Sequence, residues 1–584
     1  MNPERGLDVL EKEPVEYWRG LLRRYFIDDR VIVMGSPSIE LQDQMAKEEK
    51  ERVEEQLRIM GEEGRQKRCK ELADAIEYNS REPPAGTLSS FPLPSCEHLQ
   101  FHQVKTWSSD GDECPHVNLR DIPMYTRISS VHTNFIYINV LFDMTDADEI
   151  TRKWLPLNIG ALAECPVLRG DQLISHEEVI ETTENITVMF HNTVGFGKTG
   201  NFEVGAYGNF VNIEVRCEES HYERVVDHLY EVLYTARVTK ERLLVFAQRM
   251  INDISQIRRN GHKMVYDLLR DSLYKPNTNT HWSSILRQHG FLKRLIDQLT
   301  AGGDSAEAAV REANETFRKI TEKPWLHIVT DLNRIKISAE PWKKFNQGAK
   351  VEPPRLYHDS ALMSRGGGGG GGGFVVGVGG LESSFLAHSA PGPDTYDAGV
   401  TAPLVVALNY FTQLEGPLWR EIRGCGLSYG YGVRAHPAEA STVLSLYKAT
   451  NAPAAYCKTR SIMTEFLSGK EFHEDMFVSA KSSAIYDLVA EVKCVADVVH
   501  QLLVNYIKQL PETHDRDMVW ALSRVSPSSA RAAAARWIPQ LFSPHGKLSL
   551  VCHPTKVKQL QEAFNKIDVK LDAYESLELT HYNN

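Results

Sequence analysis

Apolar positions recur at helical spacing near the start of the chain. Pro14 favours the first turn of a helix, and the apolar residues that follow share one helical face: Tyr17, Trp18, Leu21, Leu22 and Tyr25. The apolar run at 31–34 (VIVM) predicts a short strand closed by a Gly-Ser-Pro turn. One helix and one strand do not make a domain, so residues 1–38 are expected to be the remnant of an upstream αβ domain.

A long polar stretch follows this remnant. From residue 39 to about residue 78 the chain is rich in Glu, Lys and Arg and nearly free of helix breakers, until Pro83 and Pro84. This pattern is typical of a solvated helix. Pro and Ser interrupt residues 85–128, which are expected to be mostly extended. The region 39–128 is therefore predicted to be a charged helical linker followed by an extended segment.

Strand and helix patterns then alternate and predict an αβ domain over residues 129–345. The apolar run 135–142 suits a buried strand, and Thr145 with Asp148 predicts a capping box for the next helix. Residues 186–217 have the pattern of consecutive hairpin strands. A long helical stretch follows, with an apolar face formed by Val225, Leu229, Val232, Leu233 and Ala236. A strand at 325–329 closes the unit.

A second set of elements repeats this order from residue 374 to residue 584. Before it lies a linker, 346–373, which ends in eight glycines, Gly366 to Gly373. Because glycine loses the most backbone entropy on ordering, this run is expected to be a disordered surface insertion. The apolar strand near 547–552 mirrors the one near 31–34, which suggests an internal duplication. The predicted fold class is α+β, with tandem αβ domains of mostly antiparallel sheets and flanking helices.

Charge and composition narrow the function classes. The 584 residues carry 66 basic and 77 acidic side chains, a net charge of -11, which disfavours nucleic-acid binding. No apolar stretch is long enough to span a membrane. The nine cysteines are scattered without a C-x-x-C pair, which argues for a reducing compartment and against a disulfide framework. The cytoplasm is the expected location, and a mitochondrial one stays open if the true N-terminus lies upstream.

The segment 416–433, GPLWREIRGCGLSYGYGV, carries the strongest functional pattern. A short helix at 418–422 is followed by glycines at 424, 426, 430 and 432, which allow tight turns and close backbone approach. Arg423 and Tyr429 stand between them. The guanidinium fork and the phenol hydroxyl suit the carbonyl oxygens of an extended peptide. The alternative is that Arg423 caps its helix and Tyr429 is a strand residue whose hydroxyl is satisfied.

This Arg, Gly and Tyr-Gly pattern after a short helix resembles the C-terminal half of the pitrilysin (insulin-degrading-enzyme-like) family of zinc metallopeptidases. Its spacing is similar to that of presequence proteases. Two further segments are similar to the family: YWRGLLRRYFIDDRVIVMGSPS before the charged linker and TNFIYINVLFDMT at the start of the third domain. The resemblance covers nearly the whole chain. It implies that Arg423 and Tyr429 form a substrate-binding pair on one wall of an enclosed chamber.

The zinc motif of the family is missing from this sequence. Family enzymes bind zinc through an inverted H-x-x-E-H on a helix, with a further Glu downstream. None of the 21 histidines begins this motif, and the nearest match, His98 to His102, has Phe101 in place of the catalytic Glu. The resemblance therefore implies no catalytic residue, metal or cofactor on this chain. The intact family enzyme would take its zinc from an N-terminal catalytic half, upstream in cis or in trans.

Three functions stay open at this point. The first is the substrate-binding half of a metalloendopeptidase that is inactive alone, with a peptide as substrate. The second is a non-catalytic structural or interaction subunit derived from this family. The third is a small metal protein built on a cluster of ligand residues: Cys96, His98, His102, Cys114 and His116. The Gly197-Lys198-Thr199 sequence is not a phosphate loop, because Asn192 stands where the first glycine is needed, and a hairpin turn is predicted instead.

Overall fold

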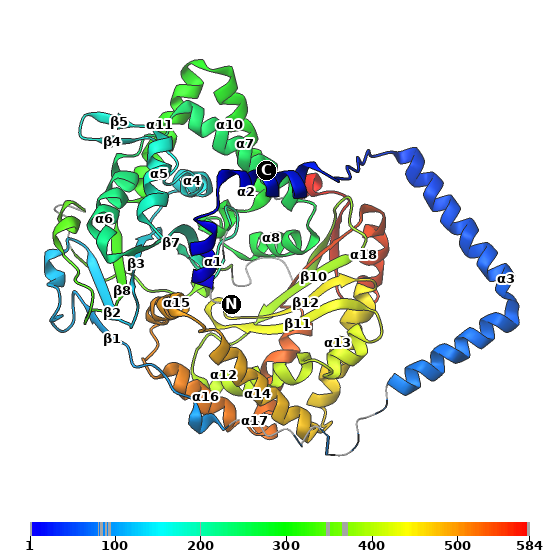
Figure 1. Cartoon of the computed structure of the whole chain (residues 1–584). Coiled ribbons are helices and arrows are strands. Elements are labelled where there is room, and N and C mark those ends of the chain that lie inside the picture. The colour runs from blue at the N-terminus through cyan, green and yellow to red at the C-terminus, as the bar shows by residue number, and fades with distance from the viewer. Residues whose placement is uncertain are drawn as a thin grey trace. The chain divides into compact units, whose positions relative to one another are not determined.

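The computed structural model describes residues 3–79, 81, 84, 86–87, 90, 95–198, 200–345, 351–364 and 372–580, in two compact units, Met1–Phe91 and Pro92–Asn584. The first unit is helical (Figure 1), with α1 (Pro3–Leu10), α2 (Val15–Leu22), a π-helical turn (Arg23–Ile27) and α3 (Ile39–Asn79). No described side chain of α2 or α3 is buried, and α3 kinks at Gly61, whose φ is 61°. The prediction of a solvated, charged helix is confirmed.

The strand predicted at 31–34 is wrong. This segment has no regular structure, and Val31 and Met34 are 87% and 88% exposed. Its residues have high β propensity, but a strand is stable only when a neighbour satisfies its backbone hydrogen bonds. None of the strands in the described part of the chain pairs with it.

The first sheet of the second unit has six strands in the order β1-β2-β8-β3-β7-β6. β2 runs parallel to β8, and the other neighbours are antiparallel. The strands are β1 (Lys105–Ser108), β2 (Tyr125–Ser130), β3 (Phe135–Asp143), β6 (Met189–Phe196), β7 (Ala206–Glu218) and β8 (Pro324–Thr330). β1 lies before residue 129 and β2 begins before it, so the sheet starts upstream of the predicted domain boundary. The boundaries themselves stay predictions.

Alternation along β3 sets the two faces of this sheet. Ile138 and Val140 point into a core formed with α4 (Glu149–Gly160), α5 (His176–Ile186) and α6 (Tyr222–Tyr230).

The capping box predicted with Thr145 is wrong. Asp148 is the N-cap of α4, and its carboxylate accepts a hydrogen bond from the backbone N–H of Thr151. A short hairpin, β4 (Val167–Arg169) and β5 (Gln172–Ile174), lies outside the sheet.

The second sheet has six strands in the order β11-β12-β10-β13-β9-β14. They are β9 (Gly372–Gly377), β10 (Ser384–Pro391), β11 (Ser428–His436), β12 (Ser441–Ala449), β13 (Lys547–Cys552) and β14 (Leu571–Tyr574). One face packs against α12 (Ala398–Thr412), α13 (Ala452–Leu467), α14 (Glu474–Ala490), α16 (His514–Ser523), α17 (Pro527–Trp537) and α18 (Val557–Asn565).

Five strands of each sheet share one topology. In both sets of five, the first strand in chain order runs parallel to the last. The last strand pairs with the second, the second with the fourth and the fourth with the third, and these three pairings are antiparallel. In chain order these are β2, β3, β6, β7 and β8 in the first sheet, and β9, β10, β11, β12 and β13 in the second. The predicted α+β fold of tandem, mostly antiparallel αβ domains is confirmed.

The chain segments that build the two sheets form the two halves of the unit, and each sheet also packs against a helix from the other half (Figure 1). α8 (Gly261–Leu273) follows five strands of the first sheet in the chain but packs through Met264 and Leu268 on the second sheet. The same core contains α7 (Lys240–Ile257), α10 (Ile285–Ala301) and α11 (Gly303–Ile320). In return, α15 (Val495–Ile507) lies between strands of the second sheet in sequence. Its residues Val499 and Leu503 cover the first sheet. The two halves are thereby joined by reciprocal packing.

Only the last two residues of the glycine run are among the described residues. Residues 366–371, where disorder is predicted, lie outside them. Gly372 and Gly373 begin β9 and pair with β13. A Cβ added at Gly373 would lie 2.2 Å from the carbonyl oxygen of Leu548. The end of the run is therefore an ordered strand, because its missing side chain lets the neighbouring strand approach.

Candidate functional site

Arg423 and Tyr429 lie together on the surface of the second sheet. The π-helical turn η8 (Trp419–Arg423) ends at Arg423, and β11 begins at Ser428, one residue before Tyr429. The Arg423 guanidinium carbon lies 4.4 Å from the centre of the Tyr429 ring, a cation–π contact. Tyr429 is 59% exposed and Arg423 is also exposed. Neither side-chain head forms a hydrogen bond with another described residue, so the donors of both face solvent.

Three glycines shape the backbone around this pair. A Cβ at Gly424 would lie 2.4 Å from the carbonyl oxygen of Arg420, so glycine closes the turn after η8. Gly430 and Gly432 stand opposite Tyr447 and Ser445 of β12. Since β11 is the edge strand of its sheet, one row of its backbone groups has no strand partner among the described residues. Two positions of this edge strand near Arg423 and Tyr429 therefore carry no side chain, and we call Gly430 and Gly432 the glycine floor.

An aromatic row connects this edge to α8. The ring of Tyr429 lies 6.4 Å from that of Tyr447, and Tyr447 lies 5.1 Å from the ring of His262, the second residue of α8. His262 in turn contacts Tyr266 at 5.2 Å. Sequence reasoning missed both His262 and Tyr447, because nothing local marks a helix that will pack on a distant sheet.

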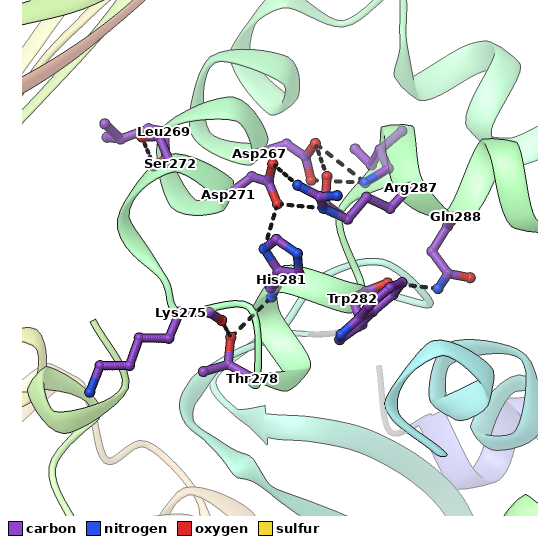
Figure 2. Close-up of polar contacts among 12 residues, drawn as sticks. Asp267, Leu269, Asp271, Ser272, Lys275, Thr278, His281, Trp282, Arg287 and Gln288 are labelled. Atoms are coloured by element: carbon purple, nitrogen blue, oxygen red, sulfur yellow. Dashed lines mark hydrogen bonds and ion pairs between the residues drawn. The ribbon is translucent and has the colours of Figure 1, made fainter. Parts of the chain in front are cut away.

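A buried polar cluster holds α8 in place (Figure 2). The Arg287 guanidinium donates two hydrogen bonds to the Asp271 carboxylate, of 3.1 and 3.2 Å. His281 Nδ1 lies 3.3 Å from the same carboxylate, and Asp267 accepts a hydrogen bond of 3.1 Å from the backbone N–H of Ile285 at the start of α10. The cluster joins α8, α9 (Asn279–Trp282) and α10. It therefore fixes the helix that carries His262.

Burial dominates the electrostatics of this cluster. Desolvation raises the pKa of Asp267 to about 7 and also raises the pKa of Asp271, where the Arg287 guanidinium opposes the effect. Desolvation, with a smaller contribution from Arg287, lowers the pKa of His281 to about 4. His281 is therefore neutral near pH 7, and Arg287 is the cation that pairs with Asp271.

The ligand-type residues at 96–116 do not form a metal site. Within the described ranges, no group of three or more His, Cys, Asp or Glu side chains could hold a metal ion. Cys114 packs against the core of the first sheet, and the His116 ring lies 6.1 Å from Trp107. His98 ends a 3-10 turn (Cys96–His98) rather than a helix. The described residues therefore supply no donor set that would fit the family's zinc.

Two further sequence predictions are addressed by the structure. Gly197, with a φ of 79°, lies in the connection between the antiparallel strands β6 and β7, which agrees with the predicted hairpin. Among the described residues, no helix is both long and apolar enough to cross a membrane.

The chain is similar to curated proteins that are themselves uncharacterized. A protein of Caenorhabditis elegans is 25% identical over 570 residues, 96% of this chain and 56% of the relative. A protein of Saccharomyces cerevisiae is 21% identical over 595 residues, 95% of this chain and 56% of the relative. The chain thus spans about half the length of the curated relatives it matches. No family model matches it.

Solved structures share the fold. The peptidase M16 inactive domain from Pseudomonas fluorescens matches with a TM-score of 0.52 and 13% identity, over 77% of this chain and 98% of that one. A protease from Helicobacter pylori matches with a TM-score of 0.52 and 10% identity, over 77% and 100%. The periplasmic protease PqqL from Escherichia coli matches with a TM-score of 0.51 and 11% identity, over 82% and 50%. The fold is therefore the M16, or pitrilysin-type, αβ fold.

Proposed function

We propose that this chain is the substrate-binding, non-catalytic half of a pitrilysin-type zinc metalloendopeptidase that cleaves peptides in an enclosed chamber. The observation that carries the proposal is the exposed Arg423–Tyr429 pair beside the glycine floor of edge strand β11. The M16-type fold, shared with a domain described as inactive, supports it. So does the absence of an H-x-x-E-H sequence from the chain.

The chemistry of the pair suits an extended peptide. The Arg423 guanidinium presents several N–H donors in a fixed plane, and the Tyr429 hydroxyl presents one O–H donor. Peptide carbonyl oxygens are the matching acceptors. The contact of the guanidinium with the ring orders both side chains before the peptide arrives, which lowers the entropic cost of binding. In this role the two residues position the peptide, while a partner half bearing H-x-x-E-H would hold the zinc that activates the attacking water.

Peptide binding by the purified chain tests the site. Fluorescence anisotropy with a labelled, unstructured peptide should give saturable binding, and Arg423→Ala or Tyr429→Phe should weaken it by roughly fivefold, the effect of one lost hydrogen bond. Arg420→Ala and Tyr486→Phe are matched controls, since both residues are exposed and lie outside the pair. Equal weakening by the controls, or no binding at all, would contradict the proposal.

Cleavage assays then test the catalytic context. The chain alone should not cleave the peptide, and adding a half with the H-x-x-E-H motif should produce cleavage that depends on Arg423. Stable assembly without any gain in cleavage would instead favour the second function, a structural or interaction subunit.

A further inference from the structure

A cavity of about 450 Å³ lies where three segments of the second unit meet: the residues before α12, the residues after α15 and the start of α16. Its lining also includes His358, from the segment that connects the two sheets. The cavity shares no residue with the Arg423–Tyr429 pair or with the polar cluster around Asp271. A cavity of this size suits a small molecule.

Two stacked rings form part of the cavity wall. The ring centres of His358 and Tyr396 lie 6.0 Å apart, and the ring planes differ by 28°. A hydrogen bond of 2.7 Å between the hydroxyls of Tyr396 and Tyr207 of β7 fixes the phenol. Leu510 and Pro511 add apolar surface to the lining. Nδ1 of His358 is buried without a hydrogen-bond partner among the described residues, so it can meet a polar atom of a ligand. The wall therefore suits a ligand with an apolar side chain.

Lys508 contributes an unpaired cation to the lining. It is the C-cap residue of α15, and its Nζ lies 5.0 Å from the centre of the Tyr396 ring. No carboxylate of another described residue lies within 4.0 Å of this Nζ. Burial lowers the pKa of Lys508 from the ordinary value of 10.5, and the charges of Glu491 and Asp515 oppose the shift. Because a lysine pKa starts far above 7, the side chain remains a cation at neutral pH.

Three carboxylates line the same cavity, and two of them are engaged by helix starts. Asp397 is the N-cap of α12 and accepts hydrogen bonds of 2.8 and 3.2 Å from two backbone N–H groups. Asp517, in the first turn of α16, accepts a hydrogen bond of 2.6 Å from the Thr513 hydroxyl. Asp394 is exposed and has no hydrogen bond or ion pair with another described residue. The cavity therefore offers one free cation, Lys508, and one free anion, Asp394.

We propose that this cavity binds a small zwitterion with an apolar side chain, either a free amino acid or a dipeptide. The carboxylate of the ligand pairs with the Lys508 ammonium, its ammonium pairs with the Asp394 carboxylate, and its side chain lies against the His358–Tyr396 wall. A ligand with only one charge forms only one of these two ion pairs, so it binds less tightly. The site is independent of the proposed function, because none of its residues belongs to the Arg423–Tyr429 pair.

Four probes that differ in charge test the proposal by ligand-observed NMR titration of the full chain. They are phenylalanine, phenylalaninamide, which lacks the carboxylate, 3-phenylpropanoate, which lacks the ammonium, and the dipeptide Ala-Phe, whose charges lie further apart. The better of the two zwitterions should bind about tenfold more tightly than either singly charged analogue, the effect of one lost ion pair. Tighter binding of phenylalanine assigns the site to free amino acids, and tighter binding of Ala-Phe assigns it to dipeptides. Equal affinity of the zwitterions and the singly charged analogues would overturn the proposal, as would binding of no probe.

Matched variants assign each charge of the ligand to one residue. Lys508→Met should weaken binding of the zwitterion about tenfold and leave phenylalaninamide unchanged, because that probe has no carboxylate. Asp394→Asn should likewise weaken the zwitterion and leave 3-phenylpropanoate unchanged. The controls are Lys566→Met, at the exposed C-cap of α18, and Asp171→Asn, at the exposed turn between β4 and β5, and neither should change any affinity.

Thermal unfolding of the four variants checks that each one folds. If Lys508→Met weakens every probe by the same factor, Lys508 supports the cavity wall rather than the ligand carboxylate, and the proposal is wrong. The same holds if the two control variants weaken the zwitterion as much as Lys508→Met and Asp394→Asn do.

Discussion

At the scale of single residues, Gly373 shows how a missing side chain fixes a strand. Its Cβ position lies 2.2 Å from a backbone oxygen of β13, a contact that only backbone movement would relieve. Gly373→Ala should lower the free energy of unfolding by about 2 kcal/mol, a typical cost of overpacking. Gly379→Ala is the control, because nothing lies within 4 Å of its Cβ position. Urea denaturation measures both, and equal stability of the two variants would contradict the argument.

His388 makes stability depend on pH. It is buried in β10, and desolvation lowers its pKa from 6.5 to about 4. The unfolded chain therefore binds the proton more tightly, and stability is lost as pH falls from 6.5 towards 4. A shift of this size corresponds to about 3 kcal/mol. Between pH 6.5 and pH 4, the unfolding free energy of His388→Gln should fall by about 3 kcal/mol less than that of the parent. Denaturation at each pH measures this difference. If the unfolding free energies of the parent and of His388→Gln change with pH in the same way, His388 is not the source of the pH dependence.

At the scale of elements, the Asp271–Arg287 pair anchors α8 to α10. The Asp271 side chain has no solvent exposure, so removing its partner leaves an uncompensated buried charge. Arg287→Ala should cost about 3 kcal/mol in unfolding free energy. Arg311→Ala should cost under about 1 kcal/mol, because its pair with Glu307 is exposed. Calorimetry of the two variants separates these outcomes, and a similar small effect for both would contradict the anchoring role.

Strands could be predicted from the sequence where the apolar pattern is long and the segment has neighbouring strands to pair with. The apolar run 135–142 lies within β3, and residues 186–217 cover the β6–β7 hairpin except its last residue, Glu218. The run 31–34 has the same kind of residues and forms no strand, because propensity without a paired neighbour does not make one. Thr145 and Asp148 were correctly placed before a helix, but which of them caps it depends on where the backbone turns.

At the scale of the whole second unit, α8 and α15 tie the two sheets together. Because each helix fills a face of the sheet in the other half, loosening either one exposes both cores. Leu503→Ala in α15 should lower stability by about 3 kcal/mol and raise hydrogen exchange in both β3 and β10. Leu268→Ala in α8 should do the same. Faster exchange confined to one sheet in either variant would show that the halves unfold separately.

The sequence by itself determined the αβ class, the repeated order of elements, the solvated helix and the proximity of Arg423 to Tyr429. These features depend on periodicity and on residues close in the chain. Only the tertiary structure decided that α8 lies on the second sheet, so that His262 meets Tyr447. These contacts join residues far apart in sequence, and the physical reason they form is the burial of helix faces against a sheet that no local pattern identifies.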